Sequence, residues 1–71
     1  MIQKENGWHI GVGGWDLWNN NEVIASVGRT IAHWAGSYFG DDLPRKTFVG
    51  PPAHPRDTML MIEEYITAPR S

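Results

Sequence analysis

The sequence predicts an α+β fold: a small antiparallel N-terminal sheet of two to four strands, packed against one long helix, with a second, shorter C-terminal helix. Three features of the sequence support this expectation. The stretch GWHIGVGGWDLW (7–18) places apolar residues on both sides of a Gly-Gly pair, which is typical of a hairpin. Residues 22–39 carry apolar side chains at helical spacing. Residues 58–66 are rich in Met, Leu and Glu, which favour helix.

The N-terminal stretch is expected to fold back at Gly13-Gly14, so that Val12 faces Trp15 and His9 faces Trp18. Because side chains alternate along a strand, one face becomes the core face, with Trp8, Ile10, Val12, Trp15 and Leu17. The polar face receives His9, Asp16 and Trp18. Two interpretations of Trp18 stay open: it contacts a partner, or it packs under a loop. A turn signal at Asn6-Gly7 makes Ile2–Glu5 a candidate third strand.

The three asparagines at 19–21 are interpreted as the N-cap of a helix that runs from Glu22 to Phe39. Its apolar stripe is expected to consist of Ile24, Val27, Ile31, Trp34, Ala35 and Tyr38. Gly40 is the expected C-cap. Gly28 and Gly36 weaken a helix, and we interpret them as points of close packing against the sheet.

The C-terminal half begins with a proline-rich loop over residues 43–55, which contains Lys46–Val49 as a candidate fourth strand at the sheet edge. Pro55 suits the first position of a second helix. The stretch 58–66 also alternates as a strand would, and both assignments stay open, although its length and composition favour helix.

Composition limits the function classes. A chain of 71 residues has room for a single domain over 1–71, and the absence of cysteine excludes disulfides and thiolate zinc sites. The formal net charge of −2 is no signature of a nucleic-acid or membrane protein. No apolar run is long enough for a membrane span or a signal peptide, so we expect a cytoplasmic protein.

No motif indicates catalysis or a cofactor. The glycines at 11–14 lack the third glycine of a dinucleotide-binding loop, since Asp16 occupies its position. The three histidines, at 9, 33 and 54, are not spaced as metal ligands, and no serine lies in a nucleophile elbow. We therefore expect no enzyme activity, no metal and no cofactor.

Two groups of residues are candidates for binding. The first is the hairpin face with His9, Asp16 and Trp18. The second is a basic segment with Arg45, Lys46 and Arg56.

The leading hypothesis is a small interaction protein that binds another macromolecule, chiefly a protein, as an inhibitor or adaptor. Phages and other mobile elements encode many proteins of this kind. The first alternative is an oligomeric binder of an anionic or nucleotide-like small molecule, which tryptophan would stack on and the basic residues would neutralise. The second alternative is a small nucleic-acid-binding regulator, which the acidic balance disfavours.

Overall fold

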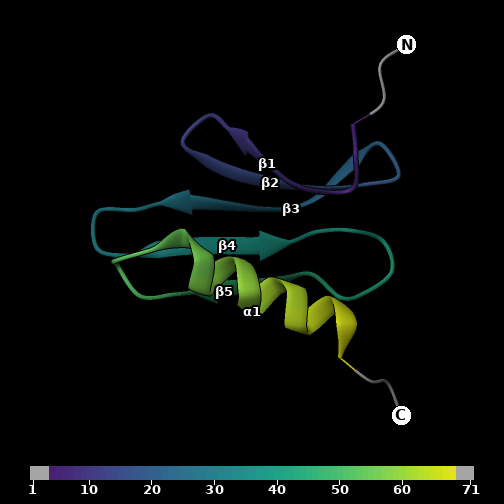
Figure 1. The fold of residues 1–71 in the computed structure, drawn as a ribbon. Coiled ribbons are helices and arrows are strands. Elements are labelled where there is room, and N and C mark those ends of the chain that lie inside the picture. The colour runs from purple at the N-terminus through teal and green to yellow at the C-terminus, as the bar shows by residue number, and fades with distance from the viewer. Residues whose placement is uncertain (1–3, 69–71) are drawn as a thin grey trace.

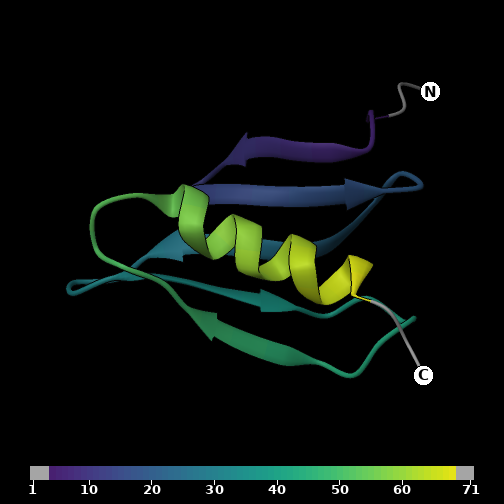
Figure 2. The same ribbon diagram turned by 60° about the horizontal axis from the view of Figure 1, so that its bottom comes forward.

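The computed structural model describes residues 4–68 and shows two layers, a five-stranded antiparallel sheet and one helix (Figure 1). The strands are paired in chain order: β1 (Gly7–Gly11), β2 (Gly14–Asn19), β3 (Glu22–Arg29), β4 (Trp34–Tyr38) and β5 (Lys46–Val49). The helix α1 (Pro55–Thr67) lies across one face of this sheet, where it contacts β3, β4 and β5 (Figure 2).

The core lies between α1 and the sheet. It is built from the buried side chains of Ala25, Val27, Tyr38, Phe48 and Ile62. The first four come from the strands, and Ile62 comes from the middle of α1. Because strand side chains alternate between faces, their neighbours point away from the helix. This second face, the open face, carries a row of directly paired residues: His9, Asp16, Ser26, Ser37 and Thr47.

The long helix expected over Glu22–Phe39 is wrong, because this segment forms β3, a short connection and β4. Two side chains of the expected helical stripe, Val27 and Tyr38, do face the core, but they do so from two paired strands. The segment contains β-branched residues and two internal glycines, which lower helix propensity. The predicted architecture is therefore wrong: the sheet has five strands instead of two to four, and α1 is the single helix among residues 4–68.

The asparagines at 19–21 form a turn and do not cap a helix. Asn20 and Asn21 have φ values of 53° and 63° and connect β2 to β3 as a two-residue hairpin loop. Two consecutive left-handed residues are the conformation of a type I′ turn, and asparagine tolerates it better than most residues. The same residue type favours N-caps and tight turns, so the motif alone did not distinguish the two.

Gly36 is a point of close packing, as expected, although it lies on β4. A Cβ atom at this position would lie 2.9 Å from the Cδ1 atom of Ile62 and 2.8 Å from the carbonyl oxygen of Ser26. The helix therefore approaches the sheet closely over Gly36. The same interpretation is wrong for Gly28, where the nearest atom to an added Cβ is the Gly13 carbonyl oxygen at 3.8 Å.

The first hairpin forms, but its register differs by two residues from the expected one. The loop is Val12-Gly13, so His9 faces Asp16 and Trp8 faces Leu17. A shift of two residues keeps every side chain on its predicted face. The core assignment is nevertheless wrong for two residues, since Val12 lies in the turn at 110% exposure and Ile10 is 77% exposed at the sheet edge.

The C-terminal predictions are largely confirmed. Pro55 begins α1, the stretch 58–66 is helical, and Lys46–Val49 forms the edge strand β5. Lys4 and Glu5 belong to no strand, and the rest of the candidate strand Ile2–Glu5 lies outside the described residues. Over residues 4–68, no helix has the length and apolar character needed to cross a membrane.

Candidate functional site

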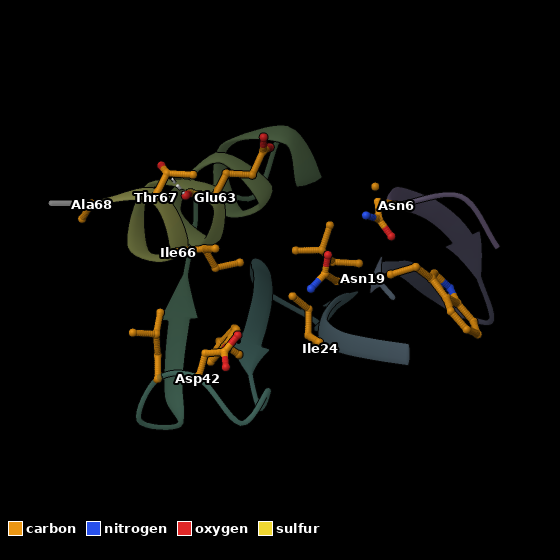
Figure 3. Close-up of a pocket in the computed structure, with 13 residues that line it drawn as sticks. Asn6, Asn19, Ile24, Asp42, Glu63, Ile66, Thr67 and Ala68 are labelled. Carbon is orange, nitrogen blue, oxygen red and sulfur yellow. Dashed lines mark hydrogen bonds between the residues drawn. The ribbon is translucent and has the colours of Figure 1, made fainter. Parts of the chain in front are cut away.

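A cleft of about 400 Å³ lies beside the C-terminal half of α1 (Figure 3). Its other walls come from the start of β1, the end of β2, β3 and the loop before β5. The lining side chains that define it here are Leu17, Ile24, Tyr38, Leu43 and Ile66, with Asn6, Asn19, Asp42 and Glu63 as polar members. Concave sites with apolar walls and few polar groups are the usual place for ligand binding in proteins.

A β-bulge shapes the apolar wall. Leu17 pairs with Ala25, but the next residue, Trp18, pairs with Val23, so Ile24 is the extra residue on β3. A bulge leaves one residue outside the ladder and redirects its side chain. Ile24 thereby joins Leu17 on the cleft wall, and Ile66 of α1 lies across from Ile24 in Figure 3.

Tyr65 fixes the loop that forms the lower wall. Its hydroxyl donates a hydrogen bond to the Pro44 carbonyl oxygen at 2.7 Å, and its ring contacts Tyr38 and Phe48 edge-on, at 5.7 and 5.6 Å between centroids. The ring contacts anchor Tyr65 in the core region, and the hydrogen bond ties the loop to the helix. Asp42, two residues before Pro44, is thus held at the cleft.

Trp8 fixes the upper wall. Its indole Nε1 donates a hydrogen bond to the Oε2 atom of Glu63 at 3.2 Å. A half-buried indole N–H needs such an acceptor, and the bond holds the carboxylate of Glu63 at the rim. Within residues 4–68, neither Glu63 nor Asp42 forms an ion pair. The cleft therefore has apolar walls and two carboxylates that lack a cationic partner in the described part of the chain.

The structure brings together His9, Asp16 and Trp18 on the open face, as the sequence predicted. The His9 and Trp18 rings meet edge-on with centroids 6.4 Å apart, and His9 lies directly opposite Asp16. The Lys4 Nζ lies 5.5 Å from the centre of the Trp18 ring. Trp18 is half-buried and also borders the cleft, so it lies between the two surfaces.

The three basic candidates lie apart from one another. Arg45 shares a shallow hollow with Phe39, Ser26 and Ser37, and it is exposed. Lys46 lies over two rings near the edge strand, 5.4 Å from the centre of Phe48 and 5.0 Å from that of Tyr65.

Arg56 lies in the first turn of α1, in a hollow with Trp15 on the opposite side of the helix from Lys46. None of the three basic residues lines the cleft. A single anion bound by all three would have to span three surfaces, so the cleft offers no support for an anionic ligand.

Neither metal coordination by the described side chains nor similarity to known proteins assigns a function to this chain. Over residues 4–68, no group of three or more His, Cys, Asp or Glu side chains is placed to hold a metal ion. No protein-family model, curated protein or solved structure matches the chain. The geometry of the surfaces is therefore the basis for a functional proposal.

Sequence reasoning missed the two carboxylates of the cleft, because the adjacent acids at 41–42 and 63–64 match no motif that indicates binding. A weak signal was present in Trp8, because an indole on a core face needs an acceptor for its N–H. The sequence alone gave no means of choosing Glu63 as that acceptor, since the two residues are 55 positions apart.

Proposed function

We propose that this protein is a binding module that takes up a basic, partly apolar segment of another protein in the cleft. The observation that carries the proposal is the pair of carboxylates, Asp42 and Glu63, at the rim of an apolar cleft. Figure 3 places them on opposite sides of the lining residues. An apolar side chain of the partner would pack against the cleft wall, and lysine or arginine residues beside it would reach the carboxylates.

Three features support a protein segment as the ligand. The cleft is open to solvent along the helix, so it suits one or two side chains of a longer chain. Among the described residues, the charged side chains at its rim are negative, which disfavours nucleotides and nucleic acids. The net charge of −2 adds a weak attraction for basic partners.

The proposal is tested by selecting binders to the full chain from a displayed library of random peptides. We expect the selected peptides to share an apolar residue flanked by lysine or arginine. Titration of one such peptide, followed by fluorescence anisotropy, should give a dissociation constant that rises with salt, because exposed charge pairs are screened. Selected peptides that are acidic, or that lack basic residues, would contradict the proposal.

Variants then locate the binding site. Asp42→Asn and Glu63→Gln should each weaken peptide binding by about two- to fivefold, as expected for exposed ion pairs. Ile66→Lys should abolish binding, since it places a positive charge on the apolar wall, where it would repel the basic residues of the peptide. Glu64→Gln is the matched control, because its carboxylate is on the same helix but outside the cleft. Equal weakening by Glu64→Gln would show that net charge, and not the cleft, determines affinity.

A further inference from the structure

No described element covers the open face of the sheet. The helix lies on the other side of the sheet, and the described chain measures 37 × 36 × 16 Å (Figure 2). One broad side of this thin slab is therefore a bare sheet. A domain of this size buries only roughly 60% of the surface of its unfolded chain, so further burial of a broad face adds substantially to its stability.

Two neighbouring rows of the open face consist mainly of small side chains. The row next to the central one consists, by register, of Gly11, Gly14, Gly28, Ala35 and Val49. In the central row, three of the five residues are Ser26, Ser37 and Thr47. This part of the face has low relief, which allows a second sheet to approach it to about 10 Å, whereas the His9 and Trp18 rings project from the side of the face formed by β1 and β2.

Opposite charges lie on the two sides of the central strand of this face. Asp16 is on β2, on one side of β3. Arg45 directly precedes β5, on the other side of β3, and shares a hollow with the open-face residues Ser26 and Ser37. Neither side chain forms an ion pair with a residue of the described range. An acid and a base on opposite sides of a central element are the arrangement that a two-fold axis makes self-complementary.

We propose that the open face pairs with the open face of a second copy, in a two-fold dimer in which Asp16 of each copy meets Arg45 of the other. A stable interface needs about 800 Å² from each partner, and the described chain, whose two long dimensions are 37 and 36 Å, can supply this only if most of the open face takes part. The short side chains allow the two sheets to come close, and the two reciprocal ion pairs fix their orientation. The cleft remains accessible, because its helix wall lies on the other side of the sheet.

The test is the molar mass of the full chain in solution, measured by light scattering from roughly 5 to 200 µM, a range that brackets micromolar dimerisation. Arg45→Asp places two carboxylates in each contact, and Asp16→Arg places two guanidinium groups there. Either single reversal should raise the dimer dissociation constant by at least about tenfold, because like charges repel in the contact. The double variant, which reverses both charges, should restore the dimer.

Controls separate this interface from general effects of charge. Glu64→Arg and Arg56→Asp change the net charge by the same amounts on or beside the helix, and they should leave the dimer intact. Ser26→Arg introduces bulk at the centre of the face and should dissociate the dimer without any charge reversal. Circular dichroism checks that each variant is folded, and the exposed Arg45 provides the reversal that least disturbs the sheet.

Three results would overturn the proposal: a monomer at every concentration, a dimer that survives Arg45→Asp and Ser26→Arg, or a double variant that stays monomeric. The result is independent of the proposed function, because a monomeric Arg45→Asp variant should still bind the selected basic peptide in its cleft. If the wild-type protein forms the dimer but binds no basic peptide, the proposed function is wrong and the dimer proposal still holds.

Discussion

At the scale of single residues, Gly36 is sterically constrained at the point where the helix meets the sheet. We expect Gly36→Ala to lower the free energy of unfolding by about 1–3 kcal/mol, because the new methyl group would overlap Ile62 and the Ser26 carbonyl oxygen. Urea denaturation of the two proteins measures this difference.

Gly28→Ala is the matched control for this substitution. It lies on the neighbouring strand, and an added methyl group has its nearest contact at 3.8 Å. We expect its free energy of unfolding to stay within about 0.5 kcal/mol of the wild type. If both variants lose the same free energy of unfolding, the close approach of the helix is not what excludes a side chain at Gly36.

The two candidate sites differ in how far the sequence could predict them. The grouping of His9, Asp16 and Trp18 followed from alternation along a hairpin, and a register error of two residues did not disturb it. The cleft was not predictable in this way. Its carboxylates come from a loop and a helix that meet only in the folded chain, so no local pattern brings Asp42 and Glu63 together.

At the scale of elements, the hairpin between β2 and β3 depends on two left-handed residues. We expect Asn20→Val to lower the free energy of unfolding by about 1–2 kcal/mol, since a β-branched side chain is strained at a φ of 53°. Asn20→Gly should leave stability unchanged or raise it slightly, because glycine adopts this conformation without crowding. Thermal unfolding of both variants tests the turn, and a tolerated valine would argue against it.

The helix depends on one buried hydroxyl near its start. Thr58 is fully buried and donates a hydrogen bond from Oγ1 to the Trp34 carbonyl oxygen at 3.1 Å. We expect Thr58→Val to cost about 0.5–1.5 kcal/mol, because the volume is kept and Gly50 still donates to the same oxygen. Thr58→Ala should cost more, since it also leaves a cavity. Denaturant titration should rank the two in this order, and equal costs would mean that the hydrogen bond contributes all of the effect.

Residues 22–39 were wrongly assigned to a helix because their apolar pattern fits both a helix and a pair of strands. Val27 and Tyr38 fit one stripe of a helix, and they also fit the core face of two paired strands. The two glycines and the β-branched residues favoured strands, but the asparagines before them were interpreted as a cap. Had they been interpreted as a turn, the remaining segment would have divided into two strands at residues 30–33.

At the scale of the whole molecule, the contact between the two layers is centred on Ile62, the largest fully buried side chain of the described residues. Ile62 is fully buried between α1 and the sheet. Its replacement by alanine should cost about 2–5 kcal/mol, whereas the total stability of a 71-residue domain is roughly 4–11 kcal/mol. We therefore expect Ile62→Ala to lower the unfolding midpoint strongly or to prevent folding, and Ile62→Val to cost only about 0.5–1.5 kcal/mol. Calorimetry of the two variants measures this difference, and similar midpoints would show that the layers are joined elsewhere.

The strands pair in strict chain order and α1 follows all of them, so the sheet is synthesised before the helix that covers it. As the chain leaves the ribosome, each hairpin can pair with the one before it, but the apolar side of the finished sheet stays uncovered until α1 follows. Until α1 packs, the sheet leaves the core side chains of Val27 and Phe48 uncovered. A chain that ends before Pro55 would keep the apolar side of its sheet uncovered, and we expect it to aggregate.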